Sequence, residues 1–247
     1  MRDYEGETKK RVEFIRTVIK TAGAHGVVYG NSGGKDSALV GILCKKACDN
    51  TVGFIMPCGS KRNYETDMTD AENIARQFGI AMRIIDLSDV KDELVRVVGE
   101  KVQITDSALI NLAPRLRMTV LYAAAASENR LVAGTGNRSE GYMGYFTKWG
   151  DSACDFNPIA DLTVTEIYEF LRHLNAPGFI IEKAPSAGLF DDQTDEDEMG
   201  VSYRSIDEFL LTGATNPCDM KVIEKFHKSG EHKRNMPITF KRNVHSS

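Results

Sequence analysis

Apolar residues recur along the chain with two alternating patterns. In some segments they follow the three-and-four spacing that turns one face of an amphipathic helix toward a core. These segments are 9–22, 37–47, 68–78 and 89–98. Short continuous apolar runs, which are typical of buried strands, alternate with them. The runs lie at 27–29, 52–56, 82–87 and 131–133.

Two later helices are marked by the residues that begin them. Asn111 is the expected N-cap of a long helix that has Pro114 in its first turn and continues to Ser127. Thr163, followed three residues later by Glu166, forms a capping-box pattern that opens a helix to Leu174. The last third of the chain is a series of helical pieces separated by polar loops.

This order of elements predicts an α/β fold, with a doubly wound, Rossmann-like parallel sheet and a helical C-terminal extension. We expect one domain over residues 1–247. Its expected parts are an N-terminal helix over 7–22, a nucleotide-binding core over about 26–190 and a helical C-terminal part over about 195–240.

Composition adds the class of protein. Of 247 residues, 42% are hydrophobic and 27% are charged, which is ordinary for a soluble globular protein. No apolar run approaches the roughly 20 residues that cross a bilayer, and the first residues lack an apolar signal segment. The five cysteines are an odd number without a C-x-x-C pair, so we expect reduced thiols. The chain is therefore expected in the cytoplasm, away from membranes.

The net charge of −4 is concentrated in one segment. Residues 191–198 carry six carboxylates, and the rest of the chain is left at +2 without them. Because no basic face of useful size remains, we do not expect binding to nucleic acid. The acidic run itself reads as a solvated loop.

A glycine-rich segment, GNSGGKDS over residues 30–37, joins the first strand to the next helix. It differs from a Walker loop, because Lys35 is followed by Asp36 and not by a hydroxyl residue. Its glycines permit positive φ and close approach of an anion, and the helix adds about half a positive charge at its N-terminus. Asp36 is suited to hold a Mg²⁺ ion that phosphate oxygens also bind. The alternative is a glycine turn that only tightens packing.

A second polar segment runs from Gly134 to Leu162, after the strand at 131–133. It is too long for a plain connection. Glu140 is a candidate for a second magnesium carboxylate, and Lys148, Asp151 and Asp155 follow it along the same segment. A long solvated loop is the alternative.

The phosphate-binding candidate SGGKDS, Ser32–Ser37, resembles the PP-loop S-G-G-x-D-S of the ATP pyrophosphatase superfamily. The resemblance implies cleavage of ATP between its α- and β-phosphates, with release of pyrophosphate and adenylation of a substrate oxygen. This motif alone leaves tRNA thiolases, GMP synthetases, argininosuccinate synthetases and NAD synthetases open.

The segment Gly134–Leu162 narrows the choice, because it is similar to the signature of ammonia-dependent NAD synthetases. Four further stretches extend the similarity: PRLRM (114–118), KAPSAGL (183–189), DEDEMGVSYRSIDEFL (195–210) and EHKRNMP (231–237). The resemblance implies ATP-dependent amidation of nicotinic acid adenine dinucleotide (deamido-NAD) to NAD with ammonia. An acyl-adenylate would be the intermediate, and AMP and pyrophosphate would be released. It also implies a homodimer, in which the alanine-rich stretch Tyr122–Ala126 could pack closely.

The resemblance implies roles for individual residues. ATP would contact Gly30, Asn31, Ser32, Gly33, Gly34, Lys35, Asp36, Ser37, Thr135 and Ser186. Deamido-NAD would contact Arg115, Lys148, Asp155, His232 and Lys233. Mg²⁺ would be held by Asp36 and Glu140, and Asp151 would orient or deprotonate the ammonia. One departure is Val164, which stands where relatives often have a lysine that braces the triphosphate, and Lys35 is a candidate to compensate.

Two rival functions remain at this point. One is another PP-loop enzyme, such as a GMP synthetase-like amidotransferase without its glutaminase. The other is a non-catalytic nucleotide sensor, although a sensor would not need Glu140, Lys148 and the basic residues at 232–234. Only 26 residues precede the first strand, so we expect free ammonia, and not glutamine, as the nitrogen source.

Overall fold

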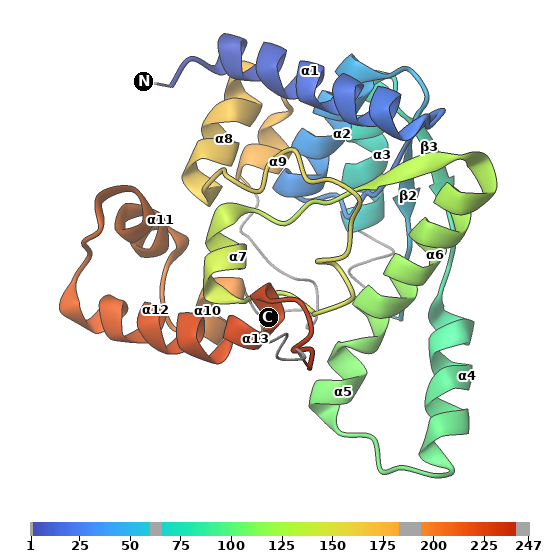
Figure 1. Cartoon of the computed structure of the whole chain (residues 1–247), viewed down its shortest axis with the longest axis vertical. Helices are drawn as coiled ribbons and strands as arrows, with labels where there is room; N and C mark the ends of the chain where they lie inside the picture. Colours follow the sequence, from blue (N-terminus) through green and yellow to red (C-terminus); the bar gives the residue numbers. More distant parts are fainter. Residues whose placement is uncertain (1, 60–65, 183–193, 241–247) are drawn as a thin grey trace, which may run out of the picture.

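The computed structural model describes residues 2–59, 66–182 and 194–240. Its centre is a four-stranded parallel sheet with the order β3-β2-β1-β4 (Figure 1). The strands are β1 (Gly26–Gly30), β2 (Thr51–Ile55), β3 (Ala81–Ile84) and β4 (Arg130–Ala133). Val28 of β1 pairs with Val52 of β2 on one side and with Val132 of β4 on the other. The chain thus crosses from β3, at one edge, to β4, at the other.

Helices cover both faces of the sheet, which confirms the predicted α/β fold. One face packs against α1 (Tyr4–Ala22), α2 (Lys35–Ala47), α3 (Met68–Phe78), α8 (Val164–His173) and α9 (Gly178–Glu182). The other side carries α4 (Ser88–Gly99), α5 (Asp106–Ile110) and α6 (Leu112–Glu128). Helix α2 is buried over residues 38–44 without interruption, because it lies between the sheet and the helices α1 and α8.

Tyr29 shows how tightly this core is packed. A Cβ atom at Gly41 of α2 would lie 2.3 Å from the Tyr29 hydroxyl oxygen, and one at Gly53 of β2 would lie 3.0 Å from it. The ring therefore requires glycine at position 41 and leaves little room for a Cβ at position 53. Its hydroxyl is buried and has no hydrogen-bond partner among the described residues.

A third cluster of helices lies beside the sheet. It comprises α7 (Arg138–Met143), α10 (Asp195–Met199), α11 (Tyr203–Thr212), α12 (Pro217–Ser229) and α13 (Glu231–Arg234). Met143, Val164 and Ile206 are buried together in its core. Asp207 of α11 ties the cluster to the rest, since it accepts hydrogen bonds from the Ser139 hydroxyl and from the backbone and hydroxyl of Thr165. The predicted helical C-terminal extension is confirmed.

Most of the predicted element boundaries agree with the structure. The capping box of Thr163 and Glu166 is present at the start of α8. Asn111 does occupy the N-cap position of α6, but its side chain makes no capping hydrogen bond. Its Oδ1 instead accepts a hydrogen bond from the Thr147 hydroxyl. The reason is that a short helix, α5, which the sequence did not predict, directly precedes α6 and changes the direction of the chain there.

The expectation of a solvated acidic loop holds only in part for residues 194–198, because Asp197 and Glu198 are exposed but the segment is helical. These residues form the start of α10, which has its own capping box at Thr194 and Asp197. Asp195 is buried, and it accepts a hydrogen bond from the Tyr203 hydroxyl. Residues 191–193 lie outside the described part of the chain. Among the helices that are described, none is both long and apolar enough to cross a membrane.

Candidate active site

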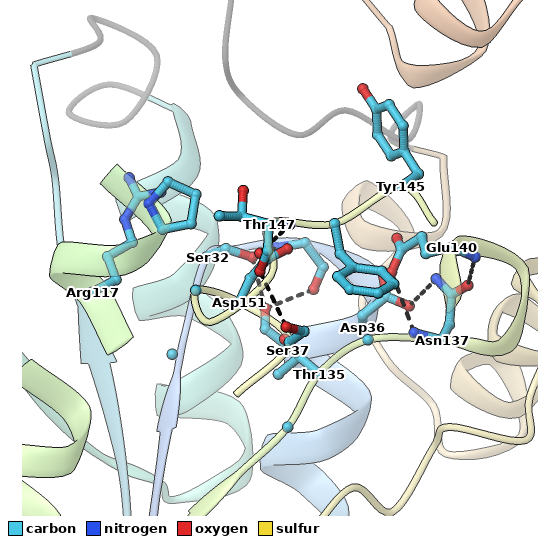
Figure 2. Close-up of a pocket in the computed structure, with 18 of the residues that line it drawn as sticks. Ser32, Asp36, Ser37, Arg117, Thr135, Asn137, Glu140, Tyr145, Thr147 and Asp151 are labelled. Atoms are coloured by element: carbon cyan, nitrogen blue, oxygen red, sulfur yellow. Dashed lines mark hydrogen bonds between the residues drawn. The ribbon is translucent and has the colours of Figure 1, made fainter. Parts of the chain in front are cut away.

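A cavity of about 710 Å³ lies at the carboxyl edge of the sheet. Its floor includes the last residues of three strands, Gly30 of β1, Ile55 of β2 and Ala133 of β4. Further walls come from α6, α7 and the C-terminal helices. This is the edge at which open parallel sheets bind ligands, since loops from neighbouring strands converge there. Figure 2 shows a close-up of the cavity.

The glycine-rich loop after β1 is held in a single shape by its own side chains and by α3. Gly33 has a φ of 72°, and a Cβ there would lie 2.2 Å from the Asp67 carbonyl oxygen, so only glycine fits. Asn31 donates to the Ala71 carbonyl at 3.2 Å, and the hydroxyl groups of Ser32 and Ser37 lie 3.2 Å apart. The loop therefore leads into the N-terminus of α2 in the arrangement that favours an anion.

Two carboxylates meet beside this loop, one on α2 and one on α7. Asn137 Nδ2 donates to Asp36 Oδ1 at 3.1 Å, and Asn137 Oδ1 accepts from the Glu140 backbone N–H at 2.9 Å. Glu140 in turn accepts from the Asn137 backbone N–H, which completes a capping box. Burial and the neighbouring charge of Asp36 raise the pKa of Glu140 well above its usual range. Such crowding of two carboxylates favours a cation between them.

The two carboxylates fit a magnesium site of the kind that is shared with a phosphate. Mg²⁺ prefers oxygen ligands, and proteins often supply only one or two carboxylates while the substrate and water supply the rest. No group of three or more His, Cys, Asp or Glu side chains able to hold a metal occurs within 2–59, 66–182 and 194–240. Asp36 and Glu140 would therefore depend on phosphate oxygens to complete the coordination.

Lys35 lies within the loop and is buried. Its Nζ is 2.8 Å from Asp36 Oδ2 and 5.6 Å from the centre of the Tyr203 ring. Burial acts to lower the pKa of Lys35, but the charges of Asp36 and Glu140 outweigh it and hold this pKa above its ordinary value. Lys35 thus joins the loop to α11. Val164, the site of the missing lysine, is buried at the start of α8.

Asp151 is presented to the cavity by a tight turn. Its Oδ1 accepts from the Thr147 backbone N–H at 2.8 Å, and the Gly150 N–H donates to the Thr147 carbonyl at 3.0 Å. Trp149 has a φ of 61°, which is rare for so large a residue and marks a strained turn. Asp151 exposes surface to the cavity, yet the surrounding protein raises the pKa of its carboxyl. A carboxylate of this kind is suited to accept a proton.

The remaining predicted residues fall into three groups. Thr135 and Lys233 line the cavity, and Lys233 Nζ donates to the carbonyls of Gly144 and Phe146 at 2.9 Å each. Ser186 lies outside the described residues. The third group, which does not line the cavity of this chain, is Arg115, Lys148, Asp155 and His232.

The contacts of this third group are with protein. Arg115 is exposed and donates to the Lys148 carbonyl at 3.5 Å. Lys148 Nζ donates to the carbonyls of His232 and Asn235. Asp155 Oδ2 accepts from the Val132 backbone N–H at 2.8 Å. The substrate contacts expected of these residues stay predictions.

Asn137 and Arg117 are among the residues of the cavity wall that sequence reasoning missed. Asn137 bridges the carboxylates, and its N-x-x-E spacing to Glu140 could have revealed a capping box. Arg117 of α6 lines the cavity, and its Nε donates to the Met56 carbonyl at 3.0 Å. The signal for Arg117 was its spacing of three from Pro114, which puts both on one helix face.

The charged side chains that line the described cavity are mostly acidic. The carboxylates are Asp36, Asp67, Glu140, Asp151, Asp195 and Glu198, and the cations are Lys35, Arg117 and Lys233. A polyphosphate would meet this excess of negative charge unless it arrived with a cation. The charge balance is therefore suited to a nucleotide that brings a divalent metal ion.

Known proteins match this chain over most of its length. A family model described as NAD synthase matches residues 7–245. An NH(3)-dependent NAD(+) synthetase from Carboxydothermus hydrogenoformans is 44% identical, over 95% of this chain and 97% of that protein.

Two solved structures resemble the fold over nearly its whole length. An NMN synthetase from Francisella tularensis superposes with a TM-score of 0.91 at 35% identity, covering 97% of this chain and 99% of that one. An NH3-dependent NAD synthetase from Campylobacter jejuni superposes with a TM-score of 0.79 at 33% identity, covering 98% and 100%.

Proposed function

This chain belongs to the NAD synthase family, and from that membership we propose that it amidates deamido-NAD to NAD with ATP and ammonia. One observation supports the chemistry of this proposal. Asp36 of the phosphate loop and Glu140 of α7 are joined through Asn137 in the same cavity. A site with this geometry can hold a triphosphate and its metal ion.

The first half of the proposed reaction activates a carboxylate. An oxygen of the nicotinate carboxylate attacks the α-phosphorus of ATP, the bond from this phosphorus to the bridging oxygen breaks, and pyrophosphate leaves. The loop over residues 30–37 and the N-terminus of α2 would hold the phosphates, and Asp36 and Glu140 would hold Mg²⁺. When bound, Mg²⁺ would neutralise charge that develops on the departing pyrophosphate.

The second half forms the amide. The nitrogen of ammonia attacks the acyl carbon, the carbon–oxygen bond to AMP breaks, and one proton leaves the nitrogen. Asp151 is the proposed acceptor of this proton or the residue that orients the ammonia, because it faces the cavity and burial raises its pKa. The adenylate would also have to be shielded from water until ammonia arrives.

The other contacts with substrate remain part of the proposal. Thr135 and Ser186 would contact ATP. The deamido-NAD contacts would be Arg115, Lys148, Asp155, His232 and Lys233. Lys233 has the strongest support of these, because it already lines the cavity.

We also propose that the protein acts as a homodimer. Helix α4 has no buried residue, and Val90, Val97 and Val98 are exposed along it, as is Ile84 at the edge of the sheet. Apolar exposure of this kind favours an interface, and the four alanines of the stretch Tyr122–Ala126 in α6 would let a second copy approach closely. A cytoplasmic location stays a prediction that the five free cysteines support.

A mononucleotide is the second candidate substrate. The NMN synthetase from Francisella tularensis superposes better than the NAD synthetase from Campylobacter jejuni, with TM-scores of 0.91 and 0.79, although their identities of 35% and 33% are close. Amidation of nicotinic acid mononucleotide would use the same adenylation and the same ammonia.

One experiment tests both candidates. The purified protein is incubated with ATP, Mg²⁺ and ammonium, and with deamido-NAD or nicotinic acid mononucleotide in separate reactions. We expect NAD from the first at the higher kcat/KM, with AMP and pyrophosphate in equal amounts. A higher kcat/KM for the mononucleotide would select the second candidate. ADP as the main nucleotide product would reject the PP-loop mechanism, and no turnover with either acid would favour a sensor.

The nitrogen source is tested in the same assay. Ammonium salts should support NAD formation, and ammonia-free glutamine should not. The rate should rise with pH through the neutral range, because free ammonia is the nucleophile. Comparable rates with glutamine would contradict the proposed use of ammonia alone.

A further inference from the structure

Helix α6 turns a single face toward the cavity. The residues of this face are Pro114, Arg117, Met118 and Leu121, which follow the spacing of three, four and seven positions. Arg115 points elsewhere, because it is only one position from Pro114, and it is exposed. Of the two arginines in the PRLRM stretch, Arg117 is therefore the one that reaches the cavity.

The guanidinium of Arg117 is fixed at the carboxyl end of β2. Its Nε donates to the carbonyl of Met56, one residue beyond that strand, at 3.0 Å. This hydrogen bond sets the plane of the group, since Nε lies in the plane of the guanidinium. Asp67 and Asp151 are close enough to influence it electrostatically. Even so, burial outweighs these carboxylates and lowers the pKa of Arg117 below its ordinary value.

Like Arg117, the other two cations of the cavity contact protein. Lys35 forms an ion pair with Asp36 at 2.8 Å, and Lys233 donates to two backbone carbonyls. Arg117 also lies on another wall. In Figure 2 it is separated from Asp36 and Glu140, and Ser32 and Asp151 lie between them. The cavity thus presents a cation on the side away from the metal carboxylates.

We propose that Arg117 forms a second oxyanion subsite, which binds a carboxylate or phosphate group of a substrate from the wall opposite the metal carboxylates. A guanidinium can donate two parallel hydrogen bonds to either group. These hydrogen bonds become stronger where water is excluded. The subsite rests on the proposed function only for the identity of its ligands. ATP and the acid nucleotide each carry such an oxyanion, so either can be the source.

The test compares three variants by equilibrium binding, with no turnover. Arg117→Gln keeps a donor for the Met56 carbonyl but removes the charge, and Arg117→Lys keeps the charge but removes the fork. Arg76→Gln, at an exposed arginine of α3 outside the cavity lining, is the matched control. Affinity is measured by calorimetry for ATP alone, deamido-NAD alone and NAD alone. We expect Arg117→Gln to weaken one acidic ligand by about tenfold or more, Arg117→Lys to weaken it less, and Arg76→Gln to bind it as the parent protein does.

The ligands distinguish the sources of the oxyanion. A loss confined to ATP assigns the subsite to a phosphate of ATP. A loss for deamido-NAD but not for NAD assigns it to the nicotinate carboxylate, because NAD has an amide there. Equal losses for deamido-NAD and NAD assign it to a phosphate of the dinucleotide.

A result that overturns the subsite is equally clear. Unchanged affinity of Arg117→Gln for all three ligands would reject it, and so would an equal loss in Arg76→Gln. If Arg117→Gln does not fold, as judged by its melting transition, Arg117→Lys decides by the same criteria. Binding that depends on Arg117 in a protein that makes no NAD would uphold the subsite and reject the proposed function. Normal binding of all three ligands by Arg117→Gln, in a protein that does make NAD, would reject the subsite and uphold the proposed function.

Discussion

Asn137 donates a hydrogen bond from Nδ2 to Oδ1 of Asp36 at 3.1 Å, although the two residues are 101 positions apart in the chain. The contact exists because β1 pairs directly with β4, so the loops that follow these strands leave the same edge side by side. Asn137 also caps α7 and thereby orients Glu140. One amide side chain thus fixes the relative position of both candidate metal ligands.

Replacing Asn137 with Ala should therefore damage the site more than the fold. We expect activity to fall about 10- to 100-fold, as when the partners of metal ligands are removed. The free energy of unfolding should fall by about 1 kcal/mol through loss of the N-cap. Asn216→Ala is the control, because Asn216 caps α12 outside the cavity lining and its loss should reduce stability alone. Equal activity in the two variants would show that the Asn137 bridge is not needed.

Asp36→Ala and Glu140→Ala test the carboxylates themselves. Each should lower kcat on the order of 10²-fold or more, about 2.7 kcal/mol, if the pair holds the metal ion that neutralises pyrophosphate. Both variants should stay folded in circular dichroism, since neither residue belongs to a hydrophobic cluster. Exposed Glu208 provides a Glu→Ala control away from the cavity. A variant with parental activity across a Mg²⁺ titration would remove that residue from the proposed metal site.

Lys35→Ala tests whether this residue replaces the lysine missing at Val164. Because Lys35 lies inside the phosphate loop beside Asp36, its loss should raise the KM for ATP more than the KM for the acid nucleotide. Lys45→Ala, on the same helix but outside the cavity lining, should change neither KM. Equal effects on both substrates would discard the idea of compensation and leave Val164 unexplained.

Tyr29 and Gly41 give a prediction about the core. Tyr29→Phe removes a buried hydroxyl that lacks a partner in the described structure, so the free energy of unfolding should stay the same or rise by up to about 1 kcal/mol. Gly41→Ala should lower it by about 1–3 kcal/mol, because the new methyl group would overlap the Tyr29 ring. Urea denaturation measures both. A clear loss of stability in Tyr29→Phe would mean that the hydroxyl is satisfied.

Asp161 and Arg11 predict how stability depends on pH. The Arg11 guanidinium bonds to Asp161 at 2.6 and 2.7 Å and holds the pKa of that carboxyl below its usual range. A lowered folded-state pKa adds stability above the unfolded-state value of about 3.9, and this contribution is lost as the pH falls through the folded-state pKa. Asp161→Asn should therefore melt at a lower temperature than the parent protein at pH 7.

The difference in melting temperature should shrink as the pH is lowered below about 4, where the parent carboxyl is also neutralised. In an Arg11→Met background, Asp161→Asn should have a smaller further effect, because Arg2, at 3.3 Å from Asp161 Oδ2, is the partner that remains. A difference that stays constant from pH 7 to pH 3 would show that Asp161 acts through something other than its charge.

The sequence by itself determined the elements and the chemistry of the phosphate loop. Periodicity located the four strands and the helices α1, α2, α3 and α4, because hydrophobic spacing is a local property of the backbone geometry. The capping box at Thr163 and the glycines of residues 30–34 were readable for the same reason, since their hydrogen bonds and φ angles involve near neighbours. Asp36 could be recognised as a candidate ligand because it follows such a loop directly.

Only the tertiary structure decided which side chains meet. The strand order β3-β2-β1-β4 brings Asp36 to Asn137, and no local pattern encodes that order. The turn of α6 selects Arg117 over Arg115, and packing against α11 buries Asp195 in a segment that reads as solvated. Burial and side-chain direction depend on contacts between residues that are far apart in the chain. Charge and composition alone therefore cannot fix them.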